Sequence, residues 1–166
     1  MGDWKTTLDT NKVEYYTPAF IVDYFGYFDY DPATTPEQAK YLGIKHYDTK
    51  ETNGLFSDWT QYENIWINPP FNQKIEFFKK AVETYKKARN NIYFLCPIEF
   101  LTTAKFHNAL KDVGIGLYIP DGRIKFLCDQ GTPKHTPAFG SVILHIQDRN
   151  GLSFLNLTNK KEANKK

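Results

Sequence analysis

The four residues Asn68-Pro69-Pro70-Phe71 are the part of the sequence whose types and spacing best suit a chemical role. The Asn side-chain oxygen and the carbonyl of the following Pro can accept hydrogen bonds from both N–H groups of one planar amine. Such an amine is a poor nucleophile because its lone pair is delocalised, so fixed acceptors help most when positive charge develops on it. Two prolines stiffen the turn without offering a competing backbone N–H, and the aromatic ring can stack on a base taken out of its helix. The tetrapeptide therefore predicts a pocket for methylating an exocyclic amine.

The flanking residues place this turn at the edge of a sheet. Glu63-Asn64-Ile65-Trp66-Ile67 is a short apolar run typical of a buried strand. Apolar residues then recur at helical spacing from Ile75 to Tyr85. Open α/β sheets bind ligands at the carboxyl ends of their strands, which is where the tetrapeptide falls. The alternative interpretation is an ordinary turn before a helix, with Phe71 in the core.

Strands and helices alternate along the chain. Helices are predicted to begin after the N-caps Thr17, Thr35 and Thr102 or Thr103, and to end at Gly26, Gly43 and Gly114. Strands are predicted over residues 27–30, 44–47, 63–67, 91–96, 116–120, 123–128, 141–146 and 152–157. This order predicts an α/β fold with a mostly parallel sheet and antiparallel strand pairing near the C-terminus.

Composition limits the class of protein. The 166 residues suit one domain over residues 1–158, followed by a charged tail over residues 159–166 that we expect to be disordered. A net charge of +2 gives no global field for nucleic acid, so any basic footprint must be local. Neither a membrane span nor a signal peptide is evident. Cys96 and Cys128 are predicted to be buried thiols, the histidines lack metal-ligand spacing, and we expect no metal and a reducing cytoplasm.

A series of short segments also occurs in a characteristic order, namely Tyr16-Thr17-Pro18, Asp29-Tyr30-Asp31-Pro32-Ala33, Asn53-Gly54-Leu55, Trp66-Ile67-Asn68-Pro69-Pro70-Phe71, Gly122-Arg123-Ile124-Lys125-Phe126 and Ala138-Phe139-Gly140-Ser141. Together they make the chain resemble the phage-type DNA N6-adenine methyltransferases, a Dam-like family of S-adenosylmethionine-dependent enzymes. The resemblance extends from about Tyr15 to Ile146. It implies a Rossmann-like class I methyltransferase fold, a DNA substrate and, if the chain is phage-encoded, the cytoplasm of a bacterial host.

The resemblance also implies residues for the cofactor S-adenosylmethionine. Thr17 and Pro18 look like the N-terminal cofactor motif, whose hydroxyl and backbone meet the methionine carboxylate. Asp31-Pro32-Ala33 look like the first cofactor motif, where an acidic group suits a sulfonium-bearing ligand. Asn53 falls where such families often place an Asp that binds the adenine amine, and an amide oxygen can still accept that bond. The stretch Ala33-Thr34-Thr35-Pro36 departs from the Gly-x-Gly loop of many methyltransferases.

In this interpretation, the reaction is direct in-line methyl transfer to adenine N6. The flipped amine bonds Asn68 and the Pro69 carbonyl while the base stacks on Phe71. The sequence identifies no dedicated base, and none is required in advance because the methylated ammonium becomes strongly acidic.

Basic residues around the predicted pocket are candidates to contact DNA phosphates. These candidates are Lys74, Arg123, Lys125, Lys134 and His135, although for any single Lys a solvated basic surface is the preferred interpretation. Residues 129–137 form a polar stretch that can act as a loop closing over substrate. The sequence leaves open the target site and whether the chain is a homodimer.

Two other functions stay open at this stage. The same pocket can serve a methyltransferase that acts on RNA bases or on protein glutamine, because these groups present a similar two-donor edge. A non-catalytic nucleic-acid-binding module that keeps the fold is the other alternative. No Ser-His-Asp or Cys-His arrangement indicates a hydrolase.

Overall fold

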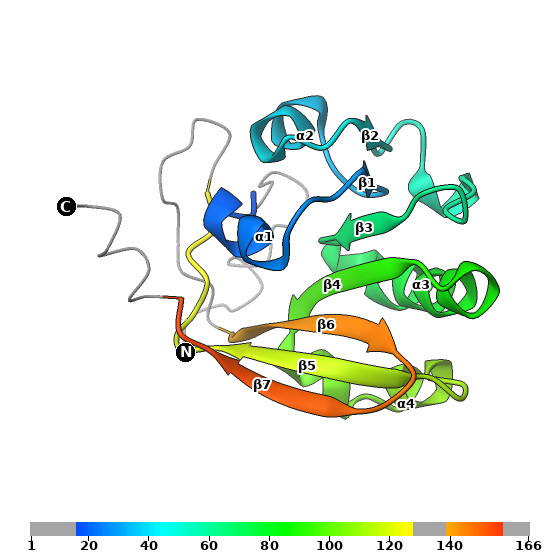
Figure 1. The fold of residues 1–166 in the computed structure, drawn as a ribbon, viewed down its shortest axis with the longest axis vertical. Coiled ribbons are helices and arrows are strands. Elements are labelled where there is room, and N and C mark those ends of the chain that lie inside the picture. The colour runs from blue at the N-terminus through cyan, green and yellow to red at the C-terminus, as the bar shows by residue number, and fades with distance from the viewer. Residues whose placement is uncertain (1–15, 128–138, 158–166) are drawn as a thin grey trace, which may run out of the picture.

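Helices lie on both sides of one mixed sheet in the computed structural model, which describes residues 16–127 and 139–157 (Figure 1). The α-helices are α1 (Ala19–Phe25), α2 (Pro36–Leu42), α3 (Lys74–Ala88) and α4 (Ala104–Ala109). The strands are β1 (Tyr30–Asp31), β2 (His46–Tyr47), β3 (Asn64–Ile67), β4 (Asn91–Pro97), β5 (Gly114–Pro120), β6 (Ser141–Gln147) and β7 (Gly151–Leu155). Short 3-10 turns are η2 (Gly54–Phe56), η3 (Phe71–Gln73) and η4 (Ile98–Thr102).

The strand order across the sheet is β2-β1-β3-β4-β6-β5-β7. The β2-β1, β1-β3, β3-β4 and β5-β7 pairs are parallel, whereas β6 runs antiparallel to both β4 and β5. The predicted α/β fold, with a mostly parallel sheet and antiparallel pairing near the C-terminus, is therefore confirmed.

Alternation along the central strands builds one core on each face of the sheet. On β3, Ile65 and Ile67 pack into the core beneath α3 and α4, while Trp66 packs into the opposite core beneath α1. On β4, Tyr93 joins Trp66 in the α1 core. Because each fully buried large side chain contributes about 1.5–3 kcal/mol, these two cores hold the strand ends rigidly in place.

The chain changes direction across the sheet at β1. From β1 it passes through α2 to β2 on one side, and then returns to β3 on the other side of β1. The carboxyl ends of β1 and β3 therefore flank a topological switch point, which is where open α/β sheets bind their ligands. Asp31 ends β1, and Asn68 directly follows β3.

The two Thr-Pro helix starts turn out differently. Thr35 caps α2 as predicted, because its Oγ1 accepts a hydrogen bond from the Gln38 N–H at 3.2 Å. The predicted cap at Thr17 is wrong, since Pro18 is extended and is itself the N-cap of α1, without a side-chain cap bond. The hydroxyl of Thr17 is used elsewhere, as shown below.

Two further local predictions are wrong. Residues 123–126 form no strand, and within the part of the 123–128 prediction that the structure describes only Leu127 makes an isolated bridge, to Tyr16. The helix predicted to run to Gly114 ends at Ala109, because Lys111 and Asp112 adopt positive φ angles of 39° and 68° that break it. In both places the apolar side chains pack into a core without forming the expected element.

Within residues 16–127 and 139–157, no helix is both long and apolar enough to cross a membrane. The same residues contain no group of three or more His, Cys, Asp or Glu side chains arranged to hold a metal ion. Cys96 is buried and makes no disulfide, as predicted, whereas Cys128 and the predicted tail over 159–166 lie outside the described residues.

Candidate active site

The predicted cofactor and amine motifs meet at the switch point. The side-chain Nδ2 of Asn68 donates a hydrogen bond to the Oγ1 of Thr17 at 3.2 Å, across 51 positions in sequence. Asn68 is half-buried, and Thr17 is only 1% exposed. The sheet order therefore brings together a residue that precedes α1 and a residue that follows β3.

Asp31 is a buried acid at the end of β1. Its side chain is 2% exposed, and Oδ1 accepts a hydrogen bond from the Ala33 N–H at 2.9 Å. Burial raises the pKa of this carboxyl to about 7, because the hydrogen bond from Ala33, which lowers the pKa, offsets only part of the desolvation. The group can therefore gain or lose its proton near neutral pH, and a nearby positive charge would favour the ionised form.

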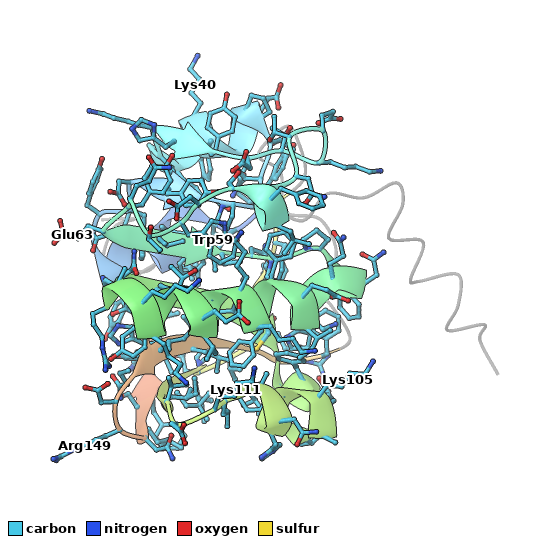
Figure 2. The ribbon with its side chains drawn as sticks, turned by 90° about the vertical axis from the view of Figure 1, so that its right-hand side faces the viewer. Lys40, Trp59, Glu63, Lys105, Lys111 and Arg149 are labelled. Carbon is cyan, nitrogen blue, oxygen red and sulfur yellow. The ribbon has the colours of Figure 1, made fainter. Side chains whose placement is uncertain are left out.

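The Asn53-Gly54 turn packs directly against Pro32. A Cβ atom added to Gly54 would lie 2.0 Å from the Pro32 carbonyl oxygen, so only Gly allows this approach. The indole Nε1 of buried Trp59 donates to the Gly54 carbonyl at 2.8 Å. Trp59 lies beside α3 in Figure 2, with its ring centroid 6.1 Å from that of Phe77. The core on the α3 side thus fixes the turn against the predicted cofactor loop.

The side chain of Asn53 caps the 3-10 turn η2. Its φ angle is 54°, and its Oδ1 accepts a hydrogen bond from the Leu55 N–H at 3.2 Å, capping η2. The resemblance implies that the same amide oxygen accepts a hydrogen bond from the adenine amine of S-adenosylmethionine. The structure brings Asn53 next to the Asp31-Pro32 loop, and its binding role stays a prediction.

Sequence reasoning missed Asp48, which follows β2 at the same edge of the sheet. Its Oδ2 accepts hydrogen bonds from the Tyr30 hydroxyl at 2.5 Å and the Ser57 hydroxyl at 2.7 Å. Burial alone would raise the pKa of Asp48, but hydrogen bonds from Tyr30, Ser57 and Thr52 together lower it. An acid directly after a predicted strand was the available signal, but the polar residues after it favoured an ordinary loop.

Sequence reasoning also missed Gln38 on α2. Its side chain is 6% exposed, and Nε2 donates to the Thr17 backbone carbonyl at 3.2 Å. The other side-chain atom, Oε1, is buried without a hydrogen-bond partner. Nothing in the sequence distinguishes Gln38 from an ordinary helix residue, because its role depends on the contact with Thr17.

Phe71 lies at the rim of the site rather than in the core. Its side chain is 40% exposed, and its ring centroid is 5.5 Å from that of Phe139. The Lys74 ammonium lies 3.6 Å from the centre of the Phe71 ring and donates to the Phe71 carbonyl at 2.8 Å. Burial lowers the pKa of Lys74. Lys74, which is predicted to contact a DNA phosphate, is therefore held against the ring of Phe71, which is predicted to stack on the base.

The basic segment that contains Arg123 and Lys125 is connected to Thr17 through the adjacent residue Tyr16. Arg123 and Lys125 are exposed, whereas the alternating Ile124 and Phe126 are buried in the core beneath α1. The backbones of Tyr16 and Leu127 exchange two hydrogen bonds of 3.0 and 2.8 Å. Figure 1 shows this segment in yellow running past α1. The other two predicted phosphate contacts, Lys134 and His135, and the predicted loop over 129–137 lie outside the described residues.

Two grooves of about 240 and 510 Å³ flank α3. Both are lined by acidic and basic side chains together, including Lys79, Glu83 and Lys87. No predicted site residue lines either groove.

Comparisons with known proteins agree with this arrangement. The family model for DNA N-6-adenine-methyltransferase (Dam) matches residues 5–166. A DNA N-6-adenine-methyltransferase of Escherichia phage T1 is 28% identical over 150 residues, which covers 80% of this chain. The chain spans about three fifths of the length of that relative, since the match covers 61% of it.

Proposed function

This chain belongs to the DNA N-6-adenine-methyltransferase (Dam) family, and on that premise we propose that it transfers a methyl group from S-adenosylmethionine to the N6 amine of adenine in DNA. The observation that carries the proposal is the hydrogen bond between Asn68 and Thr17 at the switch point. It joins the motif suited to a planar amine with the motif that the resemblance assigns to the methyl donor.

On the amine side, Asn68 and the Pro69 carbonyl supply the acceptors. Because the amide nitrogen of Asn68 faces Thr17, the amide oxygen is the atom that accepts from the adenine amine. The acceptors favour the form of the amine that carries developing positive charge, and this gain is largest in the transition state. The proton leaves late from a strongly acidic ammonium, so no residue is assigned as a dedicated base.

Phe71 provides the surface for the flipped base. Its ring is partly exposed, and its neighbour Phe139 is aromatic. A base that leaves its duplex loses stacking energy, and an aromatic side chain restores part of it. The Lys74 ammonium against this ring adds positive charge close to where the DNA backbone would pass.

The residues at the end of β1 fit the methyl donor. S-adenosylmethionine, when bound, would supply an electrophilic methyl group on a positively charged sulfur. The buried Asp31 carboxyl suits a cationic ligand, and the buried Oε1 of Gln38 is an acceptor without a protein partner. Asp31, Pro32, Ala33 and Asn53 would hold the donor together with the backbone of Thr17 and Pro18. Gln38 is added to these residues, which the resemblance implied.

Arg123 and Lys125 join Lys74 as the candidates for DNA phosphate contact among the described residues. Arg123 and Lys125 are exposed on a segment whose apolar residues anchor it beneath α1. Since phosphate contacts fix orientation without reading sequence, these residues would position the duplex rather than select its target.

The test compares the wild-type chain with Asn68→Ala, using labelled S-adenosylmethionine and DNA, RNA or protein in separate reactions. Digestion to nucleosides followed by mass spectrometry should find N6-methyladenine from DNA with the wild type. Loss of the amide should reduce that product at least about 100-fold, as for other acceptors or donors aimed at developing charge. Asn72→Ala is the matched control, because Asn72 is exposed and lies four positions further along the chain.

The outcomes separate the alternatives. Methylation that appears only in RNA or in protein would move the proposal to the other substrates of the same pocket. A chain that binds no S-adenosylmethionine in calorimetry would be a binding module rather than an enzyme. Equal activity of Asn68→Ala and Asn72→Ala would remove Asn68 from the reaction.

A further inference from the structure

We propose that the Thr17 hydroxyl positions the target amine by orienting the Asn68 carboxamide, rather than by binding the methyl donor. This inference rests on the proposed function and reassigns only the Thr17 hydroxyl, because the resemblance also gives the backbone of Thr17 and Pro18 to the methyl donor. In this role Thr17 is a positioning residue, since it acts through Asn68 and does not touch the reacting atoms.

The contact itself supports this role. Asn68 Nδ2 donates to Thr17 Oγ1 at 3.2 Å, within the range of an ordinary hydrogen bond. The hydroxyl has no duty as a helix cap, because Pro18 is the N-cap of α1 and makes no side-chain cap bond. Thr17 is also 1% exposed, so its end of the contact is shielded from water.

Orientation matters because a carboxamide has two different ends. Its oxygen accepts hydrogen bonds, whereas its nitrogen only donates. An amide nitrogen turned toward the adenine amine would set donor against donor, and the amine would lose an acceptor when positive charge develops. By accepting from Nδ2, the Thr17 hydroxyl holds the carboxamide in the orientation that the structure shows, with Nδ2 toward Thr17.

The backbone of Thr17 is fixed from two sides. Gln38 on α2 donates to the Thr17 carbonyl at 3.2 Å. On the other side, Tyr16 pairs with Leu127 through two backbone hydrogen bonds. The hydroxyl is therefore placed by two other segments of the chain before any ligand binds, and such preorganisation is what an orienting group requires.

The experiment uses Thr17→Val, which keeps the shape and removes the hydroxyl, and Thr17→Ser, which retains the hydroxyl. Thr84→Val is the matched control, because Thr84 is also buried and its hydroxyl bonds the Lys80 carbonyl within α3. The single-turnover methylation rate on DNA, the Kd for S-adenosylmethionine and the melting temperature are measured for all four chains.

We expect Thr17→Val to slow methylation about tenfold, since one oriented hydrogen bond is lost, while its Kd for S-adenosylmethionine stays within about twofold of wild type. Thr17→Ser should restore most of the rate, and Thr84→Val should match the wild type in both rate and Kd. Restoration by Ser identifies the hydroxyl as the active feature even where Val lowers the melting temperature.

Other outcomes would overturn the inference. A tenfold weaker Kd with an unchanged rate would make Thr17 a ligand of the methyl donor. A wild-type rate in Thr17→Val, or no recovery in Thr17→Ser, would show that the hydroxyl does not position Asn68. If the wild-type chain methylates no adenine, the proposed function fails and this inference fails with it. If the wild-type chain methylates adenine and Thr17→Val does so at the same rate, only this inference fails.

Discussion

The two halves of the candidate site differ in how deeply they are buried. The donor half consists of Thr17-Pro18, Asp31-Pro32-Ala33 and the Asn53-Gly54 turn, and Trp59 packs behind that turn. The base half consists of Asn68-Pro69-Pro70-Phe71 with Lys74 and Phe139, and both Pro70 and Phe71 are exposed. One half is built into the core, whereas the other faces outward.

This difference follows from what each half has to receive. A small ligand that binds in the same way at every turnover gains from a preformed wall, because little ordering remains to oppose binding. A base must come out of a duplex, so its wall has to be reachable from the surface. The Thr17–Asn68 hydrogen bond connects the rigid half to the open one.

The strongest way to break the comparison is Gly54→Ala, which attacks the packing of the donor half. A Cβ atom 2.0 Å from the Pro32 oxygen forces the backbone apart, and the adjacent Trp59 contact resists the shift. We expect a loss of more than about 3 kcal/mol in the free energy of unfolding, beyond the usual cost of overpacking. Urea denaturation measures this loss.

Gly122→Ala serves as the control, because a Cβ at Gly122 meets nothing within 4 Å. Its free energy of unfolding should stay within about 0.5 kcal/mol of wild type, as is usual for a surface substitution. A Gly54→Ala chain as stable as Gly122→Ala would mean that the donor half is not rigid, and the contrast between the two halves would disappear.

Local sequence rules predicted the features of this site that depend on near neighbours. The Thr35 cap is set by a residue three positions away, and the position of Asn68-Pro69-Pro70-Phe71 after a strand follows from the apolar run before it. The strand 123–128 was wrongly predicted, because Ile124 and Phe126 alternate as in a strand but pack against α1 without a neighbouring ladder. Alternation reports burial, and burial does not require a strand partner.

The contacts that give the site its chemistry depend on strand order instead. Thr17 meets Asn68 across 51 positions in sequence, and Gln38 on α2 and the Tyr16–Leu127 pair hold Thr17 in place. The roles of Gln38 and Asp48 likewise appear only when α2 and β2 are placed beside β1. Hydrophobic periodicity predicts which segments are helices or strands but not the order of the strands in the sheet. The contacts of Thr17, Gln38 and Asp48 could therefore not be predicted from the sequence.

The pH dependence of Asp31 sharpens the comparison, since the buried acid belongs to the donor half. Its folded pKa is about 7, above the ordinary 3.8, so its favourable contribution is complete below pH 3.8 and is lost as pH rises through 7. Asp31→Asn removes this loss. We expect the variant to be more stable than wild type at pH 8 by about 2 kcal/mol, roughly half the full linkage value because a buried amide has its own cost.

Near pH 4 the linkage gain is absent and the cost of the buried amide remains, so Asp31→Asn should there be less stable than wild type by about 2 kcal/mol. Chemical denaturation at several pH values measures this reversal. The methyl donor gives a second readout, because its positive charge favours the ionised carboxylate. Its affinity for the wild type should rise from pH 6 to pH 8, and its affinity for Asp31→Asn should stay flat. Parallel pH profiles for the two chains would show that Asp31 does not titrate near neutral pH.

The smallest expected effect comes from Phe71→Leu in the base half, which keeps an apolar side chain and removes the aromatic face. Stacking of one base on an aromatic ring contributes about 1–3 kcal/mol, and Leu retains part of that contact. We therefore expect kcat/KM for DNA to fall about tenfold, with the Kd for S-adenosylmethionine unchanged. Steady-state methylation and calorimetry measure the two quantities.

Phe56→Leu is the matched control, since Phe56 is 87% exposed and lies in η2 rather than beside Asn68. It should leave kcat/KM for DNA unchanged. A loss of cofactor affinity in Phe71→Leu equal to its loss in kcat/KM would mean that the ring supports both halves. Because Phe71 contacts Phe139 and Lys74 at the rim, a loss confined to DNA is what an open wall for a flipped base requires.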